Sequence, residues 1–388
     1  MQVISFVGAA LYSGFWFWRW GRLGVKYRVW PLLGWFSGLI CAGSVSGAVA
    51  WGSQMTSNAL NYEAGTPGVT RRQYYSLFAS SNRWYAAFSM SYGLEFLCLI
   101  IPKLILLGRL TDNAVRGLRM HANATHKFLG SRVLPMLHRS ISALVVVCSF
   151  AGLIAFSAAS VFEAQKAQLR DQAAAACDSE GHDTNSSVAL FDASSVIVPK
   201  AATAQAVQNF SEAIALLLIS VTYGLLMPLC VAMYRQAEQL AARAVVNAQA
   251  RTDGEQHGSR TLRAASAVAI VDDAMQAAMD QRRRLIISCV VVLITFPARA
   301  AFDFLNAYSS FDLKYNPACG LCEMCQSDQF FVNIWLNYTP EFQPIVVALS
   351  SPLPLTVSLW IITAADRRAL EISTNVLRAR LGRDVQMQ

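Results

Sequence analysis

Seven stretches of the chain are apolar over the length that a membrane-crossing helix requires. They cover residues 3–18, 29–51, 85–108, 141–162, 213–234, 285–305 and 345–365. A helix rises about 1.5 Å per residue, so roughly 20 apolar residues cross about 30 Å of hydrocarbon. The sequence therefore predicts an all-α fold, a polytopic membrane protein built as a bundle of seven transmembrane helices.

The composition supports this class of protein. Hydrophobic residues make up 54% of the chain and charged residues only 14%, whereas soluble domains carry about 25% charged residues. These values exclude a disordered chain and a disulfide-rich miniprotein. The net charge of +8 does not require a nucleic-acid partner, because the cytoplasmic loops of membrane proteins normally hold such an excess. The expected partner is the lipid bilayer.

The first apolar stretch resembles a signal peptide in length, but its flanks favour a retained helix. No basic residue precedes it, and it ends in Phe15-Trp16-Phe17-Trp18-Arg19-Trp20. A signal peptide has a basic start and a cleavage site with small residues. Aromatic residues beside a basic one are typical of a helix end at the membrane interface.

The basic residues predict the orientation. Residues 19–28, 109–139, 235–284 and 366–388 contain 23 Lys and Arg, and the alternate loops 52–84, 163–210 and 306–342 contain 7. Basic loops stay in the cytoplasm, so we expect the N-terminus outside and the C-terminus inside. We expect one seven-helix transmembrane domain, residues 1–365, and a cytoplasmic tail, residues 366–388.

Two cytoplasmic segments have distinct patterns. In residues 235–284, two segments rich in helix-forming residues extend the fifth and sixth apolar stretches and are separated by Thr252-Asp253-Gly254 and His257-Gly258-Ser259. The tail carries leucines at helical spacing among five arginines. This pattern fits an amphipathic helix on the anionic inner leaflet, and equally a solvated helix.

Cysteines and glycosylation motifs occur in the loops predicted to lie outside. Cys177, Cys319, Cys322 and Cys325 could bind a metal if reduced, but an outer compartment favours disulfides among them. Asn185 and Asn337 begin Asn-x-Ser/Thr motifs, which predicts a glycoprotein.

Charged residues inside apolar stretches are the candidate site residues. Each costs about 2.5–3.5 kcal/mol on insertion scales, so such residues are often functional. Glu95 lies near the middle of the third stretch, and Arg299 lies one turn before Asp303 in the sixth. We expect Glu95 and Arg299 to lie at similar depth, within reach of an ion pair that either lines a cavity or only joins two helices. Lys103 could snorkel to the interface, and Glu212 lies at the end of a stretch, so both receive less weight.

The second stretch contains Gly34-x-x-x-Gly38 and Gly43-x-x-x-Gly47. Small residues at this spacing allow two helices to approach closely. The motif fits a homo-oligomer, and it fits packing within one bundle, which is the commoner use.

No enzyme motif is present. All five histidines lie in loops, and the chain contains no HExxH, GxSxG, P-loop or dinucleotide-binding sequence. We therefore expect a non-enzymatic protein with no metal and no cofactor.

The predicted layout resembles that of G-protein-coupled receptors. Within it, Phe296-Pro297-Ala298-Arg299-Ala300-Ala301-Phe302 and the segment from Leu353-Pro354 to Trp360-Ile361-Ile362 resemble the last two spans of the THH1/TOM1/TOM3 family of receptor-like membrane proteins. The resemblance implies a receptor-like function.

The leading hypothesis is a receptor-like protein of the plasma membrane or an endomembrane, which senses a signal at its outer face. It would relay the signal to a cytoplasmic partner through residues 235–284. Two alternatives stay open, a transporter or channel that uses Glu95 and Arg299, and a structural scaffold of a membrane complex.

Overall fold

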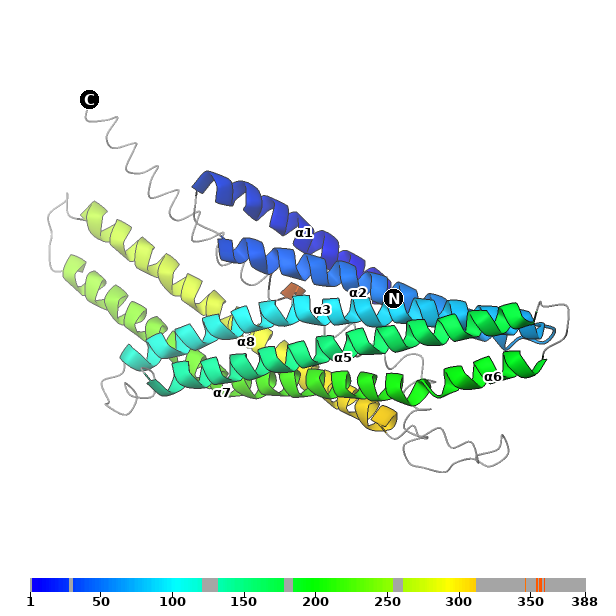
Figure 1. Cartoon of the computed structure of the whole chain (residues 1–388). Helices are drawn as coiled ribbons and strands as arrows, with labels where there is room; N and C mark the ends of the chain where they lie inside the picture. Colours follow the sequence, from blue (N-terminus) through cyan, green and yellow to red (C-terminus); the bar gives the residue numbers. More distant parts are fainter. Residues whose placement is uncertain are drawn as a thin grey trace. The chain divides into compact units, whose positions relative to one another are not determined.

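The computed structural model describes residues 2–27, 31–120, 132–177, 184–253 and 261–311, together with 346, 354, 356, 357 and 359. The described part contains helices and no strands, which confirms the predicted all-α class. The helices are α1 (Gln2–Tyr27), α2 (Pro31–Ala64), α3 (Arg71–Met120), α5 (Leu134–Ala176), α6 (Thr184–Ser195), α7 (Val198–Asp253) and α8 (Thr261–Phe311) (Figure 1).

Five of the described helices are long and apolar enough to cross a membrane. They cover Gly34–Ala64, Arg71–Arg116, Leu134–Ala176, Asn185–Gln236 and Arg282–Ser310. These ranges include most of the second predicted span and all of the third to sixth. The first predicted span forms α1, which is not among these five. Most of the seventh, residues 345–365, lies outside the described residues, as does the tail, 366–388.

Rows of apolar side chains on these helices face outward. Helix α5, for example, exposes Leu144, Val147, Phe150, Ile154 and Val161. Single exposed apolar residues are ordinary on a soluble protein, but a continuous row marks a surface for an apolar partner. The rows and the five apolar helices support a multi-pass membrane protein in contact with lipid.

The chain divides into two compact units. Unit 1 comprises residues 1–105, 140–220 and 294–355, and unit 2 comprises residues 106–139, 221–293 and 356–388. Unit 1 contains α1, α2 and α6, together with parts of α3, α5, α7 and α8.

Helices occupy most of the segments that the sequence analysis treated as outer loops. Helix α2 continues to Ala64 and α3 begins at Arg71, so only a short turn at Gly68 (φ 93°) joins them. Likewise, α5 continues to Ala176. Hydropathy detects the apolar part of a helix, whereas residues 163–176 are polar and alanine-rich but still good helix formers.

This polar part of unit 1 has a small core of its own. Tyr75, Ala173 and Ala174 are buried there, and Phe191 of α6 stacks on Tyr75 at 5.1 Å between ring centroids. The guanidinium of Arg170 lies 5.0 Å from the ring centroid of Phe78 and 5.2 Å from that of Phe191. Aromatic and cation–π contacts thus join α3, α5 and α6.

The glycines of α2 make room for neighbouring helices of unit 1, where α1 lies along α2 (Figure 1). A Cβ at Gly38 would lie 3.0 Å from the ring of Phe17, and one at Gly43 would lie 2.6 Å from Leu99. One at Gly47 would overlap the ring of Phe6. Packing within one chain therefore occupies three of the four motif glycines.

In unit 2, the predicted helical character is confirmed for residues 235–253 and 261–284. Helix α7 continues to Asp253 and so includes Thr252 and Asp253 of the predicted break, and the rest of that break lies outside the described residues. An ion pair of 2.5 Å between Glu238 and Arg282 joins the two helices.

Candidate functional site

The three candidate site residues of the sequence analysis are all buried within unit 1. Glu95 lies on α3, and Arg299 and Asp303 lie on α8. The Nε atom of Arg299 donates to the Asp303 carboxylate at 3.0 Å, across one helical turn. Charged side chains this deep in an apolar helix need partners, and this pair satisfies part of that need.

Glu212 of α7 is the main partner that the sequence analysis underestimated. Its Oε1 lies 3.3 Å from Nη2 of Arg299. The Tyr92 hydroxyl donates to Glu212 Oε2 at 3.2 Å, and Gln208 Nε2 donates to the same oxygen at 3.0 Å. The apolar stretch begins at Ala213, which placed Glu212 at a membrane interface. Because α7 begins at Val198, Glu212 instead lies inside a continuous helix and is buried.

Lys103, which received little weight because a lysine there could snorkel to the interface, is also buried. Its Nζ lies 4.7 Å from the ring centroid of Phe296, and it interacts electrostatically with Glu212, Glu95 and Asp303. On α2, Gly47 lies against Glu95, because a Cβ there would be 3.0 Å from Oε2 of Glu95. The recorded ion pairs of Arg299 are with Glu212 and Asp303, and a direct pair with Glu95 stays a prediction.

These five charged side chains form one cluster from α3, α7 and α8. Two bases, Lys103 and Arg299, face three acids, Glu95, Glu212 and Asp303. If all five are ionised, the cluster has a formal charge of −1. Within this cluster, Arg299 is paired with the carboxyl groups of Glu212 and Asp303.

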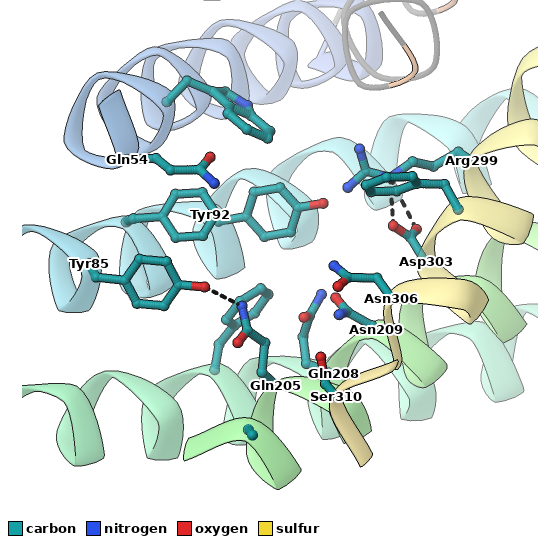
Figure 2. Close-up of a pocket in the computed structure, with 15 residues that line it drawn as sticks. Gln54, Tyr85, Tyr92, Gln205, Gln208, Asn209, Arg299, Asp303, Asn306 and Ser310 are labelled. Atoms are coloured by element: carbon teal, nitrogen blue, oxygen red, sulfur yellow. Dashed lines mark hydrogen bonds and ion pairs between the residues drawn. The ribbon is translucent and has the colours of Figure 1, made fainter. Parts of the chain in front are cut away.

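A cavity of about 170 Å³ lies beside this cluster within unit 1. Figure 2 shows side chains from several helices pointing toward one another around it, with Tyr92 and Arg299 near Asp303 and the amides of α7 opposite. The lining combines aromatic and carboxamide side chains from α2, α3, α5, α7 and α8: Trp51, Gln54, Tyr85, Phe88, Tyr92, Phe156, Ala202, Gln205, Gln208, Asn209, Arg299, Phe302, Asp303, Asn306 and Ser310.

Several lining side chains hold one another in place. Gln205 Nε2 donates to the Tyr85 hydroxyl at 2.6 Å (Figure 2). The rings of Trp51 and Phe88 pack edge to face with 5.7 Å between their centroids, and those of Tyr92 and Phe156 do so with 5.2 Å. Such contacts fix the walls before anything binds.

Four polar atoms of the lining residues have no hydrogen-bond partner among the described residues. They are Nε1 of Trp51, Oε1 of Gln208, Nδ2 of Asn209 and Nη1 of Arg299, on side chains that are only 1% to 5% exposed. Leaving a buried polar atom unpaired costs about 1–3 kcal/mol. These four atoms are buried against the protein itself, so they are not part of the accessible wall of the cavity.

The sequence analysis missed this lining because most of its polar residues are uncharged. Gln205, Gln208 and Asn209 lie in the segment treated as an outer loop, and Trp51 ends an apolar stretch. Burying an uncharged amide costs less free energy than burying a charge, so a buried amide is less conspicuous in a sequence. Their spacing on α7, at positions 205, 208, 209 and 212, is a helical face that could have indicated the site.

The other predicted site residues contribute little to this picture. Cys177 is a free thiol packed against the Tyr75 core, so the described structure does not support a disulfide there. Cys319, Cys322, Cys325 and Asn337 lie outside the described residues, and Asn185 is exposed at the start of α6. The described residues contain no cluster of His, Cys, Asp and Glu suited to a metal ion.

No known protein family, curated protein or solved structure matches the chain.

Proposed function

We propose that the chain is a receptor-like membrane protein that binds a small molecule in the cavity of unit 1. In this proposal the chain crosses the membrane seven times, with its N-terminus outside and its C-terminus inside. Binding is relayed through residues 235–284 to a partner in the cytoplasm, and the protein catalyses no reaction. The observation that carries the proposal is the cavity, which aromatic and carboxamide side chains from five helices line.

The course of two helices supports the relay. Helices α7 and α8 provide Gln208, Asn209, Arg299 and Asp303 to the cavity, and the same helices continue into residues 221–293 of unit 2. A ligand shifts a conformational equilibrium only if it binds one state more tightly than the other. The cavity residues of α7 and α8 lie on the same helices as the predicted cytoplasmic segment. A movement of these helices would therefore change both the affinity of the cavity for a ligand and the conformation of that segment.

A transporter is the second candidate, and the charge cluster favours it. A conduction path needs polar residues at matched depth on several helices, and the structure brings five buried charged side chains together from α3, α7 and α8. Charges within membrane helices often mark the path of an ion or substrate.

The experiment uses the full chain in lipid nanodiscs and measures hydrogen–deuterium exchange of residues 235–253 and 261–284. Four probes of single-ring size differ in charge and polarity: uracil, benzoate, benzylamine and benzene. We expect at least one probe to change exchange in these segments, and Asn306→Ala, at a lining residue outside the charge cluster, to remove the change. Asn58→Ala, at an exposed asparagine outside the cavity, is the matched control and should retain it.

The same probes are then tested for uptake into sealed vesicles that contain the protein. A probe that changes exchange without being taken up supports a receptor. Uptake or a current, lost in Asn306→Ala and kept in Asn58→Ala, would favour the transporter. Binding without any response in either assay would refute both and leave the scaffold.

A further inference from the structure

Two carboxyl groups of the charge cluster face one guanidinium group. Nη2 of Arg299 lies 3.3 Å from Oε1 of Glu212, and Nε of Arg299 lies 3.0 Å from the carboxyl group of Asp303. The two carboxyl groups are also within hydrogen-bond range of each other. An ionised carboxylate only accepts hydrogen bonds, so two carboxyl groups bond directly only when one of them carries a proton.

The charges around Glu212 favour that proton. In the described part of the chain, the titratable side chains that interact with Glu212 come from two helices: Tyr92, Glu95 and Lys103 of α3, and Arg299 and Asp303 of α8. With Glu212 itself, they place three acids against two bases. An unbalanced charge is costly to bury, and one added proton makes the cluster neutral.

A second buried glutamate of unit 1 shows the contrast. Both oxygens of Glu163 on α5 accept from Nζ of Lys166 at 2.8 Å, and Arg170 interacts electrostatically with the same carboxylate. Bases therefore balance the charge of Glu163 without a proton. This residue is the matched comparison for Glu212, because both side chains are about 5% exposed.

The contacts of the two carboxyl groups place the proton on Glu212. Both oxygens of Asp303 lie 3.0 Å from Nε of Arg299, whereas Glu212 contacts Arg299 through one oxygen at 3.3 Å. The other oxygen of Glu212 accepts from Tyr92 and Gln208, which are uncharged. A negative charge is stabilised most where a cation is closest, so Asp303 keeps the charge.

The cavity brings solvent to this carboxyl pair. Asp303, Arg299 and Tyr92 line it at the cluster (Figure 2), and its lining continues along α8 to Ser310. At about 1.5 Å per residue, this part of α8 is about 16 Å long. A polar cavity of about 170 Å³ has room for several water molecules. Water there connects Asp303 with the polar end of α8.

The opposite side of the cluster is apolar. On α7, Leu216 and Ile219 follow Glu212 by about one and two turns, and on α8, Phe296 precedes Arg299 by about one turn. All three apolar side chains are at most 1% exposed. A proton therefore reaches the carboxyl pair through the cavity and not past these side chains.

We propose that Glu212 and Asp303 form a proton-binding site, in which the two carboxyl groups share one proton that exchanges with solvent through the cavity. With the proton bound, Glu212 is a neutral acid that donates to the Asp303 carboxylate, and the cluster has no net charge. Release of H⁺ to water leaves both carboxylates ionised and the cluster at −1. This inference goes beyond the proposed small-molecule role, because the proton can exchange whether or not any probe binds in the cavity.

Infrared difference spectroscopy of the full chain in lipid nanodiscs tests the bound proton. A protonated carboxyl group has a C=O stretching band that a carboxylate lacks, and exposed carboxyl groups are already ionised at neutral pH. We expect such a band at neutral pH, its loss at alkaline pH and its return when the pH is lowered. Glu212→Gln should remove the band, whereas Asp171→Asn, at an exposed acid paired with Arg83, should retain it. A band that is absent, that survives at every pH or that persists in Glu212→Gln would overturn the proposal.

Thermal unfolding gives a second readout, which does not depend on the spectrum. Glutamine has the shape of a protonated glutamate and no charge, so Glu212→Gln should leave the unfolding midpoint at neutral pH almost unchanged. Glu163→Gln removes a charged partner of Lys166, so it should lower the midpoint. Equal losses in the two variants would show that Glu212 is an ionised partner of Arg299 and would overturn the proposal.

The route is tested by filling the cavity. Ala202 lines the cavity on α7, whereas Ala204, on the same helix, does not. After a rapid pH change, the carboxyl band should respond several-fold more slowly in Ala202→Phe and at the normal rate in Ala204→Phe. Equal rates in both variants would overturn the route through the cavity.

Discussion

At the scale of single residues, charges within apolar stretches correctly predicted which residues are buried, but they did not predict the ion-pair partners. Arg299, Asp303 and Glu95 could be singled out from the sequence because charges in apolar stretches are rare, and all three are buried in unit 1. Glu212, the acid that pairs with Arg299 from another helix, could not. Whether Glu212 is buried depends on where α7 begins. Hydropathy places the start of this helix too late, because the first turns of α7 are polar.

The pairing of Arg299 gives the first prediction at this scale. Arg299→Gln leaves Glu212 and Asp303 buried without their cation, so we expect it to destabilise the fold by about 3–5 kcal/mol. Adding Asp303→Asn should recover part of this loss, because it removes one stranded acid. Denaturant unfolding of the four proteins in detergent gives the coupling free energy between Arg299 and Asp303, which we expect to exceed about 0.5 kcal/mol.

The control for this cycle is the arginine–aspartate pair Arg83–Asp171. Its side chains are 60% and 37% exposed, so Arg83→Gln should cost less than about 1 kcal/mol. Additive losses at Arg299 and Asp303 within about 0.5 kcal/mol would show that the two residues do not couple.

At the scale of helices, the sequence predicted the apolar centres well and the ends poorly. Apart from residues 29 and 30, the second to sixth predicted spans lie within described helices, because a run of some 20 apolar residues has few alternatives to a helix in lipid. The extensions of α2, α3 and α5 were missed, since polar helices and polar loops have similar hydropathy. Helix propensity identified the extensions of α7 and α8 in residues 235–284, where alanine and glutamine are frequent.

The glycines of α2 give the prediction at this scale. In Gly47→Ala, the new methyl group would overlap the buried ring of Phe6 and lie 3.0 Å from Oε2 of Glu95. We expect a loss of about 1–3 kcal/mol in the free energy of unfolding, the usual cost of overpacking a core. Thermal unfolding of the purified protein in detergent measures this loss as a lower midpoint.

Gly52→Ala is the matched control on the same helix. Nothing lies within 4 Å of a Cβ at Gly52, so the better helix propensity of alanine should raise stability by up to about 1 kcal/mol. If Gly47→Ala left the midpoint unchanged but abolished chemical crosslinking between two copies, the glycine would serve a homo-oligomer and not packing within the chain.

At the scale of the whole molecule, the number of spans and the orientation rest on charge statistics and not on the described helices. Five helices qualify as membrane spans by length and composition. An even number of spans would place the two termini on the same side of the membrane, and an odd number would place them on opposite sides. The basic residues give an independent answer, because 23 of them lie in one set of connecting segments and 7 in the other. Translocation of a loop depends on this bias and not on how the helices pack.

The orientation is tested with two exposed positions on opposite predicted sides. Tyr62, in the last turn of α2, is 81% exposed, and Val246, on the extension of α7, is 62% exposed. In intact cells, a membrane-impermeant maleimide should label Tyr62→Cys above the level of the unsubstituted chain. It should label Val246→Cys only after the cells are permeabilised, because the basic residues of 235–284 keep that segment in the cytoplasm. The reverse pattern would place the cytoplasmic relay on the outer side and rule out the proposed receptor, whereas labelling of both positions in intact cells would mean that the number of spans between them is even.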